Sequence, residues 1–283
     1  MGFKPEKIIG FVSPLFYIWK ENLPIMHYKK GILEINILDI PNLYKILSHF
    51  LLISATHKTN NIKAPQLIWE DRKITLEDVR SLLYRHPSQY WEEIGKDLYF
   101  FDSFYKNSVE GNLLELQSHF LVEIINKYKP ESILEVGCGY GRHLKMLHKF
   151  NPKWKLVGID ISSTALENAL IYLKDCNVEL YKYDEGSDLE FRDNSFDIVF
   201  SSSVLCFCYP EIMNKLRKEM LRIARLYVIH DEDQLSKYAF SFNHNLSDLY
   251  RNENYVIEYE GDNPHSMENQ DLKILIVSKK TFS

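Results

Sequence analysis

From about residue 112 onward, short apolar runs alternate with stretches in which apolar residues recur at helical spacing. The apolar runs are nearly continuous, which is typical of parallel strands covered on both faces. Regular alternation of such strands with helices predicts a doubly wound α/β sheet. We expect strands at 132–137, 155–160, 178–184, 196–205 and 225–233, and helices at 112–128, 141–150, 162–175 and 211–224.

The end of the chain has a different pattern. Two largely apolar stretches, 254–262 and 271–280, flank a polar loop and predict an antiparallel hairpin. Such a hairpin fits at the edge of an otherwise parallel sheet. Residues 112–283 are therefore expected to form one α/β domain around a mostly parallel, seven-stranded sheet.

The first 88 residues predict a separate appendage with mixed α/β or α+β character. The pattern indicates a strand at 31–40 and helices at 41–58 and 75–86, and we find no catalytic motif among them. Recognition of a substrate or partner is the role we expect for this part. Residues 89–111 then link it to the α/β domain.

Composition narrows the class of protein. The formal net charge of −5 disfavours broad binding to a nucleic-acid backbone, although a local basic patch stays open. The four cysteines lack the spacing of a zinc site, and their number does not suggest a disulfide framework. Because no secretory signal is visible and the apolar stretch at 8–19 is too short to span a bilayer, we expect a cytoplasmic protein with neither a metal site nor a membrane span.

The stretch "ILEVGCGYGRH" at 133–143 places three glycines at the end of the first predicted strand of the domain. Glycine permits unusual backbone angles and close approach of a ligand, and the next helix can offer N–H groups to an anion. A dinucleotide-binding GxGxxG turn would need glycine where Arg142 stands, and no GK[ST] follows for a P-loop. A tight turn without any ligand is the alternative interpretation.

Acidic residues follow the next two predicted strands. Asp160 ends the second strand, where a carboxylate can accept both hydroxyls of a ribose. Asp184 and Glu185 follow the third strand, where an acid could accept the exocyclic amine of an adenine. Each acid alone could be a strand-end cap, but together with the glycines they predict a nucleoside site at the carboxyl edge of the sheet.

Three stretches together resemble the class I S-adenosylmethionine (SAM)-dependent methyltransferases. They are "ILEVGCGYGRHLKML", "VGIDISSTALENA" and "DLEFRDNSFDIVFSSSVLCF", and the resemblance covers about residues 112–280. It implies a Rossmann-like methyltransferase fold, SAM as the cofactor and methyl transfer by in-line displacement. By this resemblance the first-strand acid and the glycines hold the methionine end, Asp160 the ribose, and Ile161 and Asp184 or Glu185 the adenine. The implied cofactor-binding residues are Glu135, Gly137, Cys138, Gly139, Gly141, Asp160, Ile161, Asp184, Glu185 and Ser202.

The chain departs from many relatives after the fourth strand of the domain. Phe207 stands where relatives often carry a histidine that can act as a base. His230, expected just past the fifth strand, is our candidate catalytic base, and a polar strand-end residue is the alternative. In relatives the segment entering the domain often folds over the cofactor, so the aromatic stretch 90–105 is either a lid or packing for the appendage.

The acceptor of the methyl group is narrowed only by exclusion. No [DN]PP[YF] stretch and no Pro-Cys pair is present, which disfavours the usual methylation of adenine and cytosine. A small molecule, a sugar or lipid intermediate, or a protein side chain remains. Two alternatives stay open: a catalytically silent SAM-fold subunit that binds a partner, and an NAD-linked oxidoreductase, which the glycine spacing disfavours.

Overall fold

The computed structural model describes residues 26–29, 32–35, 66–69, 72–74, 91–92, 113–234, 242–266 and 271–279. The chain divides into two compact units. One comprises Met1–Phe104 and Lys237–Phe240, and the other comprises Tyr105–Ser236 and Ser241–Ser283. Each unit is described by itself.

The first unit contains a four-stranded sheet in the order β1-β2-β3-β4. Its strands are β1 (Met26–Lys29), β2 (Ile32–Ile35), β3 (Gln66–Trp69) and β4 (Arg72–Ile74). The outer pairs are antiparallel and β2 pairs with β3 in parallel. Only β2 coincides with a predicted strand. The helices predicted at 41–58 and 75–86 lie outside the described residues.

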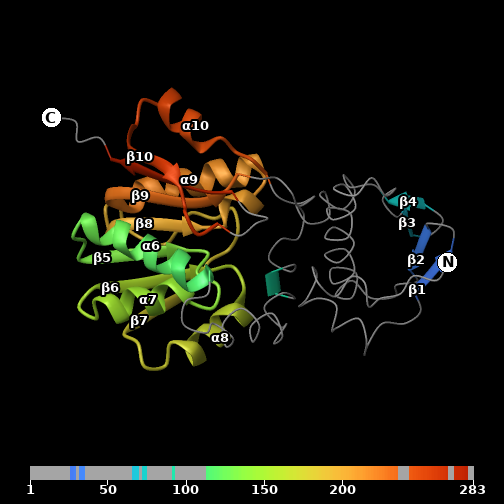
Figure 1. The fold of residues 1–283 in the computed structure, drawn as a ribbon, viewed down its shortest axis with the longest axis horizontal. Helices are drawn as coiled ribbons and strands as arrows, with labels where there is room; N and C mark the ends of the chain where they lie inside the picture. Colours follow the sequence, from blue (N-terminus) through green and yellow to red (C-terminus); the bar gives the residue numbers. More distant parts are fainter. Residues whose placement is uncertain are drawn as a thin grey trace. The chain divides into compact units, whose positions relative to one another are not determined.

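The second unit is built on a seven-stranded sheet in the order β10-β11-β9-β8-β5-β6-β7. Figure 1 labels all of these strands except β11, and the labels follow this order from top to bottom. The sheet is parallel from β7 to β9, and β11 and β10 add antiparallel strands at one edge. The strands are β5 (Ser132–Val136), β6 (Lys155–Asp160), β7 (Val178–Lys182), β8 (Phe196–Ser202), β9 (Ala224–Asp233), β10 (Val256–Asp262) and β11 (Leu272–Ser278). The predicted fold class is confirmed.

Helices cover both faces of this sheet, as the nearly continuous apolar strands require. One buried cluster joins the sheet to α6 (Leu113–Lys127), α7 (Arg142–Phe150) and α8 (Ser163–Tyr172). The other joins it to α9 (Pro210–Ile223) and α10 (Leu246–Asn252). Because β5, β6 and β8 are buried almost throughout, the two clusters share these central strands.

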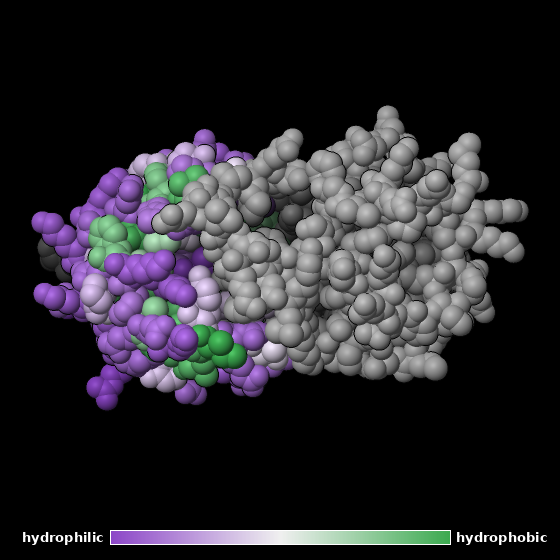
Figure 2. Space-filling model, turned by 60° about the horizontal axis from the view of Figure 1, so that its bottom comes forward, coloured by the Kyte–Doolittle hydropathy of each residue, from purple (hydrophilic) through white to green (hydrophobic). Residues whose placement is uncertain are grey.

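Local signals explain where the helices begin. Ser162 caps α8 by accepting the N–H of Ala165 at 3.1 Å, and Pro210 occupies the first turn of α9. The sequence did not predict α10, a short helix capped by Asn245. On the face shown in Figure 2, hydrophilic and hydrophobic residues of the second unit are interspersed. Within the described residues, none of the helices combines the length and apolar character that crossing a membrane requires.

Candidate functional site

The candidate site lies at the carboxyl ends of β5, β6 and β8. From β5 the chain builds β6 and β7 on one side, and β8 and β9 on the other. This reversal of strand order is the topological switch point at which open α/β sheets bind ligands. The glycine turn that follows β5 and the acid that ends β6 are therefore placed together by the topology.

The glycine turn has a backbone that other residues would adopt only under strain. Gly137, Gly139 and Gly141 have φ angles of 70°, 52° and 83°. A Cβ at Gly137 would lie 2.4 Å from Cγ2 of Val204, and a Cβ at Gly141 would lie 2.5 Å from Cδ1 of Leu173. The first and third glycines are thus required by close packing as well as by backbone conformation.

The N–H groups of the turn point to β6. Gly137 and Cys138 both donate to the carbonyl of Ile159, at 2.8 and 2.9 Å, and Gly139 donates to Oδ2 of Asp160 at 2.8 Å. These three donors are therefore committed within the protein. A pyrophosphate loop would use such donors for its anion, so this turn is better suited to a neutral or cationic group.

Glu135 lies at the base of the turn, 2% exposed, on the last part of β5. Its Oε2 atom is buried without a hydrogen-bond partner. Burial raises its pKa well above the usual value, and the nearby Arg142 charge offsets this only in part. A buried carboxyl with a free oxygen is a position at which a ligand ammonium would be stabilised.

Asp160 connects the turn to the start of α8. Its Oδ1 accepts the N–H of Ser162 at 2.9 Å, while its Oδ2 accepts that of Gly139. A carboxylate has about four lone-pair sites, so it can accept several hydrogen bonds at once. The next residue, Ile161, is half-buried, and its packing on an adenine ring stays a prediction.

The two acids predicted after β7 differ in environment. Asp184 is exposed, and its backbone carbonyl accepts the N–H and the hydroxyl of Ser187. Glu185 is half-buried, and burial raises its pKa to about 7. Because a partly desolvated carboxyl gains more from a buried donor than an exposed one does, Glu185 fits an adenine amine better than Asp184.

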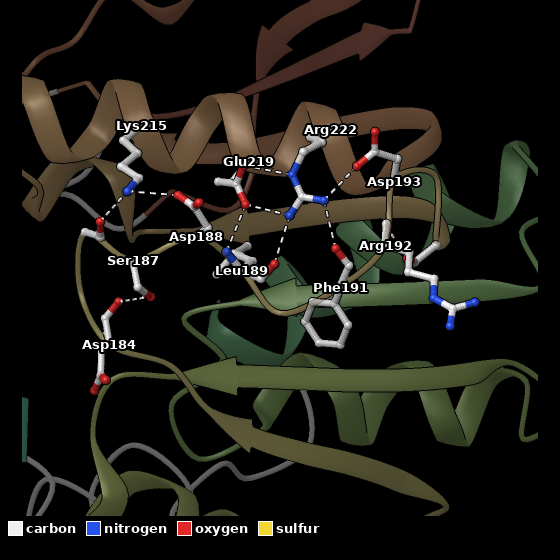
Figure 3. Close-up of polar contacts among 12 residues, drawn as sticks. Asp184, Ser187, Asp188, Leu189, Phe191, Arg192, Asp193, Lys215, Glu219 and Arg222 are labelled. Carbon is white, nitrogen blue, oxygen red and sulfur yellow. Dashed lines mark hydrogen bonds and ion pairs between the residues drawn. The ribbon is translucent and has the colours of Figure 1, made fainter.

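The loop that carries Glu185 is held by one face of α9, shown in Figure 3. Arg222 donates to the carbonyls of Leu189 and Phe191 and to Glu219, and Glu219 in turn accepts the N–H of Leu189 at 2.8 Å. One turn earlier on this face, Lys215 donates to the carbonyl of Gly186 at 2.6 Å. We call Lys215, Glu219 and Arg222 the α9 clamp.

Sequence reasoning missed the α9 clamp. Its members stand at i, i+4 and i+7, a spacing that marks one helical face. That spacing could have indicated a charged stripe, but a charged stripe is normally solvated. Its contact with a loop about 30 residues away is decided only by the tertiary structure.

Two further predicted residues are engaged within the protein. The side chain of Cys138 is buried in the core, where it packs at Gly158 of β6. Ser202, at the end of β8, donates to Oδ2 of Asp231 at 3.2 Å, and Asn263 also contacts that carboxyl. The structure therefore gives the side chain of Cys138 a packing role, while Ser202 lies at the correct edge of the sheet.

The structure does not support His230 as a base at the cleft. The residue lies inside β9 rather than past its end, and it is 0% exposed. Both ring nitrogens are engaged, Nδ1 with Ser201 Oγ at 3.0 Å and Nε2 with the Tyr250 hydroxyl at 2.7 Å. Burial lowers its pKa to about 3. The sequence-based expectation failed because β9 continues through residue 233, which turns residue 230 toward α9 and α10.

Comparison with solved structures supports the fold. Magnesium protoporphyrin IX methyltransferase from Synechocystis, solved with bound SAM, superposes with a TM-score of 0.54 at 14% identity, over 71% of this chain and 97% of that one. A protein from Pyrococcus horikoshii gives a TM-score of 0.52 at 19% identity, over 64% and 96%. At these identities the likeness is one of fold.

Sequence comparison finds a methyltransferase domain in the chain. Residues 133–225 match the model of a methyltransferase domain. A probable methyltransferase, ltbC, from Aspergillus luteorubrus is 32% identical over 39% of this chain and 41% of its own length. A sterol 24-C-methyltransferase from Clavispora lusitaniae is 25% identical over 52% and 42%. The chain spans less than half the length of these curated relatives.

Residues 133–225 thus carry a methyltransferase domain, and the comparisons support the predicted class I SAM-dependent methyltransferase with SAM as its cofactor. The residues present fit that cofactor. Glu135 has a buried oxygen without a partner that could bind an ammonium, and Asp160 places a carboxylate beside the turn. The N–H groups of Gly137, Cys138 and Gly139 are bonded within the protein and do not face an anion. The site therefore suits a cationic amino-acid nucleoside.

Proposed function

We propose that this protein transfers a methyl group from SAM to a small-molecule, sugar or lipid acceptor, or to a protein side chain. The orphaned carboxyl oxygen of Glu135, beside a glycine turn fixed to Asp160, is the observation that carries the proposal. The relatives bear names that specify a sterol and a carrier-bound malonyl group. These names favour a small or lipid acceptor for this chain as well.

Bound SAM supplies a methyl group on a positively charged sulfur, which is a good leaving group. The residues of the chain then have to bind and orient the reactants and exclude water, which can lower a barrier by several kcal/mol. In this proposal Glu135 binds the amino group, Asp160 the ribose hydroxyls, and Glu185 the adenine amine.

Proton removal is not assigned to His230. Its ring is neutral, wholly buried and bonded at both nitrogens, so it has no free lone pair for an acceptor. An acceptor that is already nucleophilic needs no such base. Asp231 lies on the other face of β9, and burial raises its pKa to about 6.

The test is calorimetry of the full chain with SAM and with S-adenosylhomocysteine (SAH). Both should bind, and combining Asp160→Ala with Gly139→Arg should abolish binding, whereas Asp175→Ala at an exposed position should leave it intact. Transfer of a labelled methyl group to a component of cell extract, identified by mass spectrometry, then names the acceptor. Absence of binding by the unaltered protein would contradict the proposal, and binding without any turnover would favour a silent subunit.

A further inference from the structure

Four buried side chains form a continuous hydrogen-bonded line across the α9 and α10 face of the sheet. The Tyr250 hydroxyl of α10 meets Nε2 of His230 at 2.7 Å, and Nδ1 of His230 meets Ser201 Oγ at 3.0 Å. Ser201 donates to Oε1 of Glu232 at 2.8 Å. None of the four residues is more than 2% exposed, so water does not supply alternative partners.

The direction of every bond in this line is fixed by its two ends. Burial raises the pKa of Glu232 to about 7. Above that pH the carboxyl is ionised and can only accept, so the Ser201 hydroxyl donates to it and must accept from His230. Burial raises the pKa of Tyr250 and lowers that of His230 to about 3, so the phenol keeps its proton and the imidazole is neutral. His230 is therefore protonated on Nδ1 and accepts at Nε2 from Tyr250.

A buried cation stands at the Tyr250 end. The guanidinium of Arg217 lies over the tyrosine ring, 4.7 Å from its centroid, and is held by two bonds to Glu253 at 2.7 and 2.9 Å. The line thus runs from a fixed positive charge to a negative carboxyl. All its dipoles point the same way, which strengthens each bond in a low-dielectric interior.

The Glu232 end holds a turn of the candidate site. Oε2 of Glu232 accepts the N–H of Val204 at 2.9 Å and that of Cys206 at 3.2 Å. Between β8 and this turn, Ser203 has a left-handed φ of 54°. The Val204 side chain packs on Gly137, where a Cβ would come within 2.4 Å of it. Glu232 therefore sets how the turn after β8 meets the glycine turn.

We propose that Tyr250, His230 and Ser201 are positioning residues that orient Glu232, so that it fixes the turn Ser203–Cys206 against Gly137. We call this hydrogen-bonded line the relay. His230 acts in the relay as the neutral, Nδ1-protonated tautomer. The relay itself follows from the fold, whereas its effect on cofactor binding rests on the proposed function. Reversing the bond at Glu232 should consequently reverse every bond behind it.

Glu232→Gln tests the direction of the relay. The glutamine amide keeps an oxygen for the Val204 and Cys206 N–H groups and turns its NH₂ toward Ser201, which must then donate to His230 Nδ1. Nitrogen-15 NMR of the imidazole, recorded above pH 8 where Glu232 is ionised, should show the Nδ1–H tautomer in the unaltered protein and the Nε2–H tautomer in Glu232→Gln. The signal is assigned by its loss in His230→Gln. Asp233→Asn, on the opposite face of β9, should leave the tautomer unchanged.

The second readout is SAH affinity. Glu232→Gln and Ser201→Ala should each weaken binding about tenfold, because one buried hydrogen bond is lost or misdirected. Tyr250→Phe is the milder variant, and it should weaken binding while keeping the Nδ1–H tautomer. Tyr255→Phe, whose ring packs edge-on against Tyr250, is the matched control and should bind normally.

The outcomes separate the two proposals. An Nε2–H tautomer in the unaltered protein, or no change of tautomer in Glu232→Gln, would overturn the relay whatever the protein binds. A changed tautomer with unchanged SAH affinity would overturn its positioning role. If the unaltered protein binds no SAH while the tautomer switches as expected, the proposed function fails and the relay stands.

Discussion

Gly139 donates its backbone N–H to Oδ2 of Asp160 at 2.8 Å, so the glycine turn after β5 and the acid that ends β6 form one unit. The other oxygen of Asp160 accepts from Ser162, the cap of α8. One carboxylate therefore fixes the cofactor turn and the start of the next helix together.

Asp160→Asn should separate these tasks. Asparagine has one acceptor oxygen, so the N–H of either Gly139 or Ser162 would face an NH₂ group. We expect the free energy of unfolding to fall by about 1–3 kcal/mol, the cost of a buried unsatisfied donor, and SAH binding to be lost. Urea unfolding and calorimetry measure the two effects. Asp175→Asn should change neither, and a fully active Asp160→Asn protein would disprove the assignment.

Glu135→Gln should raise the stability of the protein and lower its affinity for SAH. Because burial raises the pKa of Glu135, its ionised form costs free energy in the folded state, and that cost grows as pH rises through the folded pKa. Glutamine carries no charge, so the variant should be the more stable protein by about 1 kcal/mol at pH 8, with the difference shrinking at pH 5. SAH affinity should nevertheless fall. A variant that is less stable at pH 8 would contradict this account.

Cofactor affinity should depend on pH through Glu185. Its pKa is raised to about 7 by burial, so stability from the neutral form is lost as pH rises from about 4.3, the unfolded value, through 7. An adenine amine donates a hydrogen bond and favours the carboxylate. SAH should therefore bind more tightly at pH 8 than at pH 6, and Glu185→Gln should flatten that change. Calorimetry at several pH values measures the SAH affinity. The exposed control Asp184→Asn should keep the pH dependence of the unaltered protein.

Gly137→Ala should fail for a steric reason that a second substitution relieves. The added Cβ would lie 2.4 Å from Cγ2 of Val204, and φ is 70°. We expect a loss of about 1–3 kcal/mol of stability, typical of strain and overpacking. Adding Val204→Ala should restore part of it, because the clash disappears while the backbone strain stays. Thermal unfolding of the single and double variants shows whether the two substitutions are coupled, and strictly additive losses would argue against the contact.

The α9 clamp should affect cofactor binding from a distance. Arg222 donates to two carbonyls and two carboxylates, which only a planar guanidinium can match. Arg222→Lys should therefore weaken SAH binding nearly as much as Arg222→Gln does. We expect a loss of about threefold to tenfold, because the lost hydrogen bonds hold the loop and only part of their free energy is transmitted to the cofactor. Arg251→Gln, which breaks exposed ion pairs on α10, is the control. An unchanged SAH affinity in Arg222→Lys would show that only the positive charge of residue 222 matters.

The sequence by itself determined most elements of the α/β domain, and it predicted the residues that we propose for the cofactor end of the site. Continuous apolar runs predicted β5, β6 and β8, and the glycines with Asp160 predicted a nucleoside site at their ends. These signals are local, since a strand buried on both faces must be apolar and a left-handed turn favours glycine. Topology then brings strand ends together without any further information.

Only the tertiary structure decided which polar residues face the site and which face the core. His230 was expected just past the fifth strand, at the edge that faces the cleft, yet β9 extends past it and turns it inward, while Glu232 beyond it holds the turn after β8. The partners of His230, Glu232 and Arg222 stand about 20 to 33 residues away in the chain. Hydrogen bonds at such separations follow from strand register and helix docking, and no local pattern encodes them.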